Sequence, residues 1–364
     1  MKPGHAPATG CNPARQLLLI LLAAAGWLGA PPLQAAEKTD VRELPDMITP
    51  DTEVAIAKGM AFLARSQARD GSWRAQAEYG GAYPTAMTAL AGLALMAGGN
   101  TPVEGRYSPN VRQAVDYLLS NSNPTGVIAR MDEEQSCMHG HGFAMLFLAE
   151  AYGMERDTAR QEKIHKVLRK AVDLTGSAQS SRGGWLYQPN NSGDEGSVTV
   201  TQIQGLRACR NAGIKVPKTI IDRACKYIEM SANPDGGISY SVGQSGSRPP
   251  ITAAAVATLY NAGEYENPVA LKALEYVKNL TKRSDHAVLS SGHEFYSLLY
   301  TSQAMYLSSD ENWKEYFPKS RDHLLKTQSS RGSWQGDHVG ETYGTAVALI
   351  ALQLPYGYLP ILQR

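Results

Sequence analysis

Ionisable side chains gather near the C-terminus, in the stretch GSWQGDHVGETYGTAVALIAL. Asp337, His338 and Glu341 lie among glycines there and precede a run of small apolar residues. A carboxyl group whose pKa is shifted by its surroundings can act as a general acid, and a nearby histidine can exchange protons with it. Glu341 or Asp337 is therefore the candidate acid, with His293 or His141 as its partner or as the base.

The elements that must position these residues are repeated, because the sequence contains six similar couplets. Each couplet is an amphipathic helical segment followed by a segment that is apolar on every side, such as AKGMAFLARSQ and then YPTAMTALAGLALMAGG. Glycines of the intervening turns are spaced by 55, 57 and 53 residues, and the last follows after 96; they are Gly71, Gly126, Gly183, Gly236 and Gly332. Repetition at such a period predicts a repeat architecture.

The two kinds of helix predict how the repeats are arranged. A helix that is hydrophobic all round has to be buried on all sides, whereas its partner needs only one apolar stripe. Two concentric rings satisfy both requirements, with the inner helices shielded by the outer ones. We expect an all-α fold, a closed (α/α)6 toroid of about twelve helices formed by residues 53–364 as a single domain. An open solenoid is the alternative arrangement.

In a closed toroid the inner helices run in one direction, so their N-terminal ends meet at one mouth. His139, His141, His293 and His338 all fall at these ends. Because His139 and His141 are two residues apart, unlike the i, i+4 spacing of common zinc sites, they and His338 are weak metal candidates. We predict no cofactor, with zinc as the alternative. The polar residues at the mouth could equally cap helices and bind free backbone N–H groups.

The expected inner wall carries several aromatic side chains, namely Phe143, Phe147, Tyr260, Tyr296, Tyr300 and Tyr343. Aromatic faces stabilise carbocations and bind apolar ligands, although they also fill the core of a closed ring. The inner segments contain no Trp, which argues against stacking on sugars and hence against a polysaccharide-processing toroid.

The N-terminus has the layout of a secretory signal peptide, with Lys2 and Arg15 before the apolar run LLLILLAAAGWLGA. We expect residues 1–36 to be cleaved, residues 37–52 to form an extension, and the protein to be exported to the periplasm or secreted. Cleavage changes the net charge from +1 to −1 and leaves no stable membrane span. A near-neutral chain has no electrostatic surface for nucleic acid. Three cysteines then remain, so this is no disulfide scaffold, although Cys209 and Cys225 could form a bridge.

The stretch KGMAFLARSQARDGSW resembles the Gln-Trp repeat of squalene and hopene cyclases, and LLKTQSSRGSW and GSAQSSRGGW repeat its second half. The similarity extends over residues 53–355. It implies the toroid shared by triterpene cyclases, protein prenyltransferases and complement thioester domains, in which the Gln and Trp pin an outer helix to the next turn. GGWLYQPNNSGDEGSVTVTQIQGLRACRNAGIKVP and YGYLPILQR also resemble exported bacterial proteins labelled as prenyltransferase and squalene-oxidase repeat proteins.

The chemistry of these families is only partly represented. The cyclases carry an Asp-x-Asp-Asp-Thr-Ala run, and the Thr-Ala step recurs here at Thr85, Thr252 and Thr345. If Thr345 takes the family's Thr position, Glu341 falls on the first acid and the other two acids are missing. The Asp-x-Cys zinc motif of prenyltransferases is absent, and EEQSCMH has the wrong order for a thioester motif.

Two functions follow from these features. The first is an exported toroid that binds a hydrophobic ligand, isoprenoid or lipid-like, in its central cavity, with cyclase-type chemistry as an extension of that role. The second is a non-catalytic scaffold that docks a protein or a cell-envelope polymer on one face. A deep apolar cavity favours the first function, whereas inner aromatic side chains that meet at the axis favour the second.

Overall fold

The computed structural model describes residues 44–363 except residues 79, 135 and 285–291, so the expected signal peptide lies outside the described residues. Residues 44–364 form one compact unit. Its described part contains twelve α-helices, two 3-10 helices and only isolated β-bridges. The helices are α1 (Pro50–Ser66), α2 (Pro84–Ala97), α3 (Ser108–Ser120), α4 (Cys137–Met154), α5 (Thr158–Ala178), α6 (Gly196–Asn211), α7 (Lys218–Met230), α8 (Pro249–Ala262), α9 (Pro268–Arg283), α10 (Glu294–Ser308), α11 (Asp310–Thr327), α12 (Glu341–Gln353), η1 (Leu354–Tyr356) and η2 (Pro360–Leu362).

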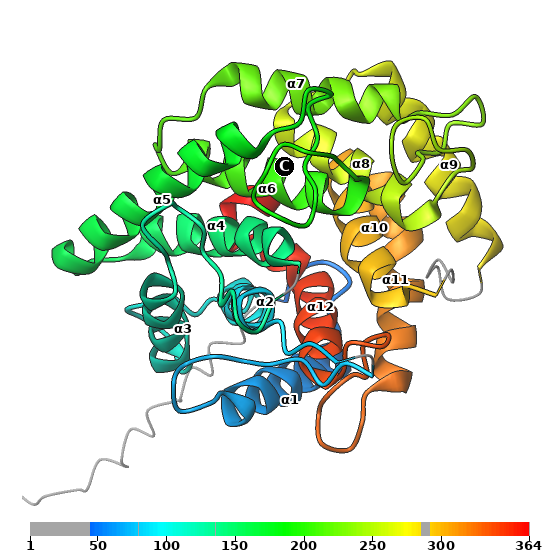
Figure 1. Ribbon diagram of the computed structural model, residues 1–364. Coiled ribbons are helices and arrows are strands. Elements are labelled where there is room, and N and C mark those ends of the chain that lie inside the picture. The colour runs from blue at the N-terminus through cyan, green and yellow to red at the C-terminus, as the bar shows by residue number, and fades with distance from the viewer. Residues whose placement is uncertain (1–43, 79, 135, 285–291, 364) are drawn as a thin grey trace, which may run out of the picture. The chain divides into compact units, whose positions relative to one another are not determined.

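The even-numbered helices form a closed inner ring. Each packs against the next, from α2 through α4, α6, α8 and α10 to α12, and α12 packs against α2 (Figure 1). The odd-numbered helices lie outside, each against the inner helix that precedes it, and α1 packs against α12 in the same way. Because the first outer helix pairs with the last inner helix, the ring has no free ends. The predicted closed (α/α)6 toroid is confirmed, and the open solenoid is wrong.

Burial follows the two predicted kinds of helix. Every residue of α2 is buried, and the inner helix α8 is buried from Pro250 to Asn261. The outer helix α7 buries only one stripe, which includes Ile221, Ala224 and Ile228, and exposes its charged side. An all-round apolar helix is stable in water only inside such a shell, so the alternation along the chain is enough to separate the two rings.

One hydrogen bond recurs where the chain passes from each turn to the next inner helix. The Trp334 backbone N–H donates to Thr345 Oγ1 at 3.0 Å, and the same bond links Trp185 to Thr199 at 3.0 Å. Three further pairs repeat it: Trp73 with Thr88, Ile238 with Thr252, and Ile128 with His141 Nδ1. In five of the six hairpins a side chain in the first turns of the inner helix therefore accepts the N–H of the residue that enters it.

This recurrence corrects one assignment made from the sequence. The first hairpin uses Thr88 as the acceptor, so Thr85 is not the equivalent of Thr252 and Thr345. Thr85 lies one turn earlier, and its hydroxyl accepts the Arg130 N–H at 3.2 Å. Both threonines are followed by the same kind of small apolar residue, which is why the Thr-Ala pattern alone did not separate them.

The glutamine and tryptophan of the repeat also act as expected. The Trp334 indole N–H donates to Leu324 O at 2.8 Å, and Trp73 and Trp185 bond in the same way to the residue ten positions earlier. Gln328 Nε2 donates to Gly332 O in its own turn and to Ala55 O of α1. Gln67 and Gln179 make the matching pair of bonds. These side chains tie each turn to the next outer helix.

We expect Thr345→Val to lower the free energy of unfolding by about 1–3 kcal/mol, because it leaves the buried Trp334 N–H without an acceptor while preserving volume. Urea denaturation measures the loss. Thr345→Ser keeps the hydroxyl and serves as the control, with a smaller loss due to one methyl group. Equal destabilisation by Val and Ser would show that the hydrogen bond does not matter.

Candidate functional site

The segments that precede the inner helices meet at one end of the ring, which we call the N-terminal mouth. Neighbouring segments are joined by backbone hydrogen bonds: the Met138 N–H donates to Tyr187 O, and the Gly196 N–H donates to Tyr240 O. The Gln76 N–H donates to Val339 O, so the first and last hairpins are joined in the same way. The mouth therefore brings together residues that are far apart in the sequence, as expected for a closed toroid.

Carboxylates at the mouth bind helix N-termini. Asp337 accepts the Phe295 N–H at 3.2 Å on both oxygens and so caps α10 from the next hairpin. Glu134 accepts the Thr85 N–H in the same manner and caps α2. Glu195 caps its own helix through the Ser197 and Val198 N–H groups at 2.7 and 2.6 Å. A helix N-terminus carries free donors and partial positive charge, which stabilise an acid placed there.

The two predicted acids have different surroundings. Glu341 binds Arg331 at 2.7 Å and the Ser333 hydroxyl at 2.6 Å. Asp337 is half-buried, and its backbone has φ of 44°, which is unusual for a residue other than glycine. Burial raises the pKa of Asp337, whereas the N–H groups at the start of α10 and the nearby His293 lower it. The net effect of these surroundings is a raised pKa for Asp337.

The structure does not gather the predicted histidines into one group. His141 is fully buried between α4 and α5, and its Nε2 bonds to Thr175 Oγ1 at 3.0 Å. Its Nδ1 takes the place that a threonine has in the other hairpins, and burial lowers its pKa to about 4. His293 is exposed next to Asp337, while His338 is exposed and pairs with Glu78 at 2.9 Å. The structure thus brings together only the candidates Asp337 and His293.

His139 belongs to a polar cluster that the search for acid and base pairs missed. Its Nε2 lies 2.9 Å from Ser197 Oγ, its Nδ1 lies 2.7 Å from Ser136 Oγ, and burial lowers its pKa. Glu195 binds the same Ser197 hydroxyl, and the Tyr187 and Tyr240 hydroxyls are hydrogen-bonded to each other nearby. The chain positions of these residues gave no signal, because they come from three different hairpins.

Within the described part of the chain, no three His, Cys, Asp or Glu side chains lie close enough together to hold a metal ion. His139, His141 and His338, the weak metal candidates, each bind a different partner. The three described cysteines are buried free thiols, so Cys209 and Cys225 form no bridge here. Burial raises the pKa of Cys137 to about 11, which keeps that thiol protonated and unreactive.

The six aromatic candidates occupy different places. Phe147 packs over Gly92 of α2, where an added Cβ would lie 2.5 Å from its ring, so it belongs to the wall between two helices. Tyr260 stacks on Tyr265 at 4.9 Å between ring centroids. Tyr296 and Tyr300 lie 4.8 Å apart, and neither hydroxyl has a hydrogen-bond partner among the described residues.

Burial raises the pKa of Tyr343, on α12, well above the ordinary value. Tyr296 and Tyr300 form an aromatic pair on α10. Phe143, the sixth candidate, borders the central space of the ring.

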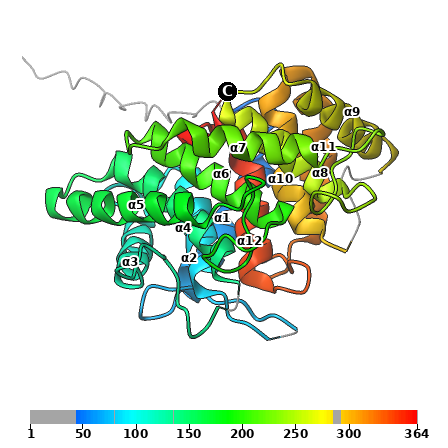
Figure 2. The ribbon, with the colours of Figure 1, turned by 45° about the horizontal axis from the view of Figure 1, so that its top comes forward.

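That central space is a small apolar cavity. The volume of the cavity is about 20 Å³, enough for about one water molecule. Its lining comes from α2, α4, α6, α10, α12 and the C-terminal segment, and consists of Leu90, Leu93, Phe143, Leu146, Gln204, Leu299, Gln303, Ile350, Leu359, Ile361 and Leu362. The C-terminal segment lies against the ring in both views (Figures 1 and 2) and packs on α6. Sequence reasoning had not placed it in the interior.

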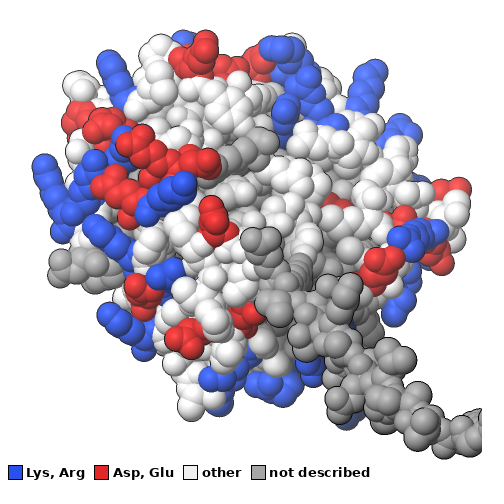
Figure 3. Space-filling model, turned by 180° about the vertical axis from the view of Figure 1, so that it is seen from behind, with Lys and Arg blue, Asp and Glu red and all other residues white. Residues whose placement is uncertain are grey.

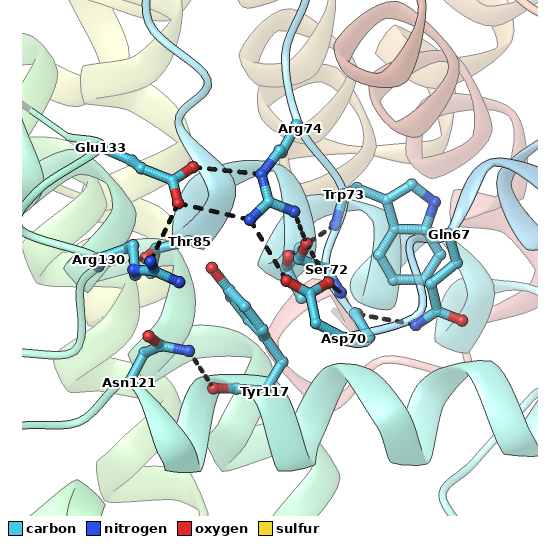
Figure 4. Close-up of polar contacts among 12 residues, drawn as sticks. Gln67, Asp70, Ser72, Trp73, Arg74, Thr85, Tyr117, Asn121, Arg130 and Glu133 are labelled. Atoms are coloured by element: carbon cyan, nitrogen blue, oxygen red, sulfur yellow. Dashed lines mark hydrogen bonds and ion pairs between the residues drawn. The ribbon is translucent and has the colours of Figure 1, made fainter.

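A further polar cluster lies at the first hairpin (Figure 4). Arg74 binds Asp70 and Glu133, with nitrogen–oxygen distances of 3.3 and 3.2 Å, and Glu133 also pairs with Arg130. Tyr117 points from α3 toward this group, and burial raises its pKa to about 12. Because its acids and arginines neutralise each other, we interpret the cluster as a joint between the first turn and the segment before α4.

On the face seen in Figure 3, acidic and basic side chains are intermixed, and no large area of one sign is present. None of the described helices is long and apolar enough to cross a bilayer.

No family model matches this chain, and no curated protein is significantly similar to it. Several solved structures share its fold. A variant of the type II terpene cyclase MstE from Scytonema superposes with a TM-score of 0.60 at 15% identity, covering 85% of this chain and 98% of that one. An inactive variant of an alpha-1,6-mannanase of Salegentibacter gives 0.61 at 10%, covering 83% and 98%. A protein from Actinoplanes gives 0.60 at 15%, covering 84% and 99%.

At these identities the likeness shows the fold alone. The chain folds as an α/α toroid like those of a terpene cyclase and of glycosidases, and this fold does not decide between them.

Buried carboxyl groups make a pH prediction possible. Burial raises the pKa of Glu150 to about 7, so between its ordinary value and pH 7 the folded chain keeps a proton that the unfolded chain loses. Stability therefore falls as the pH rises through this window and levels off above it. Glu150→Gln should raise the free energy of unfolding by roughly 2 kcal/mol at pH 8 and leave it nearly unchanged at pH 4.

Chemical denaturation at several pH values measures this difference. The exposed Glu266 provides a control, because Glu266→Gln should shift stability equally little at both pH values. A Glu150→Gln gain that is the same at pH 4 and pH 8 would contradict the assigned burial effect.

Proposed function

We propose that the toroid binds an apolar ligand with a branched aliphatic chain, of isoprenoid or lipid kind, in the space enclosed by the inner helices. One observation carries the proposal: leucine, isoleucine and phenylalanine side chains of four inner helices converge there, and the space already holds branched aliphatic side chains from the C-terminal segment. Apolar surfaces with a few polar groups are the usual lining of a ligand site. The expected export of the chain remains part of the proposal.

A fold-level analogy supports this class of ligand. A variant of MstE from Scytonema with the same fold was solved in complex with geranylgeranyl dihydroxybenzoate, at a TM-score of 0.58. The mannanase variant was solved with alpha-1,6-mannotriose. A sugar needs polar partners and flat aromatic surfaces, but the central space here is mostly aliphatic and no inner helix carries a tryptophan. The lining therefore favours the apolar ligand.

The non-catalytic scaffold remains the alternative. The small volume of the cavity and the use of acids as helix caps both fit a ring that supports a docking face. The two functions differ in whether the interior takes up a ligand, so a measurement of ligand content decides between them.

A proton-transfer activity is a second candidate, favoured by Asp337. Left-handed backbone at a non-glycine residue is concentrated at functional sites, and Asp337 combines it with a raised pKa and a neighbouring histidine. Asp337 would supply the proton to an alkene, and His293 would exchange protons with it. Glu341 instead forms an ion pair with Arg331.

We expect an organic extract of the purified native protein to contain an apolar compound, detected by mass spectrometry. Leu93→Phe should lower its amount and weaken farnesol binding at least tenfold, because Leu93 borders the cavity. Leu95→Phe is the matched control, since Leu95 is buried on the same helix without bordering the cavity. A clean extract and no farnesol binding by native protein would instead support the scaffold.

For the proton-transfer candidate, incubation with geranylgeraniol should give an isomer of unchanged mass, resolved by gas chromatography. Asp337→Asn should reduce its rate at least a hundredfold, because an amide has no acidic proton. Glu341→Gln should keep most of the rate. Absence of product from the native protein, or equal loss in both variants, removes Asp337 from consideration.

A further inference from the structure

The C-terminal segment packs against the inner ring. It lies at the end of the ring that is opposite the N-terminal mouth. After α12 and η1, Gly357 adopts a left-handed conformation with φ of 63°, which turns the chain. η2 then places three aliphatic side chains in the wall of the central cavity. Leu359, Ile361 and Leu362 are only 3%, 4% and 8% exposed, so these three side chains are part of the core.

Buried polar side chains hold the peptide unit of Ile361. Its carbonyl accepts from Asn261 Nδ2 at 3.2 Å. Asn261 Oδ1 in turn accepts from Gln204 Nε2 at 3.1 Å, and Gln204 also donates to Gln303 Oε1 at 2.8 Å. On the other side, the Ile361 N–H is close enough to Glu150 to lower its pKa against the effect of burial. We call Glu150, Gln204, Asn261 and Gln303 the polar collar.

The collar requires an explanation, because it gathers buried polar side chains beside a mainly aliphatic cavity. Its members come one each from α4, α6, α8 and α10, and all are buried. A buried amide or carboxyl group costs stability unless its hydrogen bonds are made, and an aliphatic residue would fill the same space without that cost. Glu150 Oε2 has no hydrogen-bond partner among the described residues. The collar therefore has capacity to bind one more donor than the tail supplies.

We propose that residues 358–363 are an internal ligand, which occupies the binding position of the apolar compound and has to leave before that compound enters. This inference rests on the proposed function. The aliphatic side chains of the segment stand in for a branched hydrocarbon chain, and the Ile361 peptide unit stands in for a polar group. The ligand that replaces it is a prenyl alcohol, because one hydroxyl can donate to Glu150 and accept from Asn261.

The way the segment is attached permits its exchange. Asn261 ties the segment to the ring through Ile361 O, whereas Gln363 Nε2 donates to Gly357 O, which directly precedes the segment. Binding that requires displacement of an internal segment is weakened by the population of the closed form. Loosening the segment should accordingly strengthen ligand binding.

The test uses the full chain with Leu359→Ser and Ile361→Ser together, and farnesol as the probe. We expect the double variant to bind farnesol at least tenfold more tightly than the native chain by calorimetry. Leu271→Ser is the control, because Leu271 is half exposed on the outer helix α9 and does not border the cavity; its farnesol affinity should be native. In the native chain, saturating farnesol should accelerate hydrogen exchange of the Ile361 amide.

Two further arms separate the possible failures. A synthetic peptide of sequence YLPILQ should raise the Tm of the double variant, and farnesol should compete with it. Farnesol binding of equal affinity in both chains, with the Ile361 amide still protected, would overturn the internal-ligand inference and leave the proposed function intact. If neither chain binds farnesol, the proposed function fails and this inference fails with it. If the peptide binds but farnesol does not displace it, the two sites are different and the inference is wrong.

Discussion

The structure depends on one hydrogen bond that is repeated around the ring, from the backbone N–H that enters an inner helix to a side chain in the first turns of that helix. It is made by threonine in four hairpins and by His141 in one. The entering residue is buried in each case, so its N–H would otherwise lack a partner, at a cost of about 1–3 kcal/mol. The same joint in successive hairpins sets the same angle between turn and inner helix, and this regularity lets the ring close.

The requirement to satisfy buried backbone groups also explains why the mouth is polar. Six inner helices bring their free N–H groups to one end, and Glu134, Glu195 and Asp337 bind three sets of them. Two of these acids come from the hairpin that follows the helix they cap, so they join neighbours as well as capping. These three acids therefore serve as helix caps, and among them Asp337 alone combines capping with left-handed backbone and a raised pKa.

The opposite end of the ring is mainly apolar, in contrast to the polar mouth. The interior is aliphatic, yet the polar collar crosses it and binds a single peptide unit of the C-terminal segment. Three linked amides and a carboxyl group add little to the stability of a core, because their hydrogen bonds at best replace those made to water. A site that exchanges one polar occupant for another does need them, which is how a cavity of only about 20 Å³ is reconciled with ligand binding.

Much of the fold was predictable from sequence, because the contrast between all-apolar and one-sided helices is strong and recurs. The site was less predictable. His141 lies between two glycines, which made it a candidate for the site. It follows Ile128, whose N–H it accepts, by 13 residues, and in four other hairpins the acceptor threonine follows its donor residue by 11 to 15 residues. Aligning the repeats would have identified it as a structural acceptor. The collar had a signal too, since Gln204, Asn261 and Gln303 interrupt apolar segments, but only the fold shows that they meet.

The most direct test of the account is a crystal structure of the full chain grown with farnesol. The account predicts electron density for the prenyl chain between α2, α4, α10 and α12, its hydroxyl at Glu150 and Asn261, and Ile361 moved out of the ring. A structure in which Ile361 keeps its hydrogen bond to Asn261 while farnesol is bound on the outer surface, or is not bound at all, would contradict it.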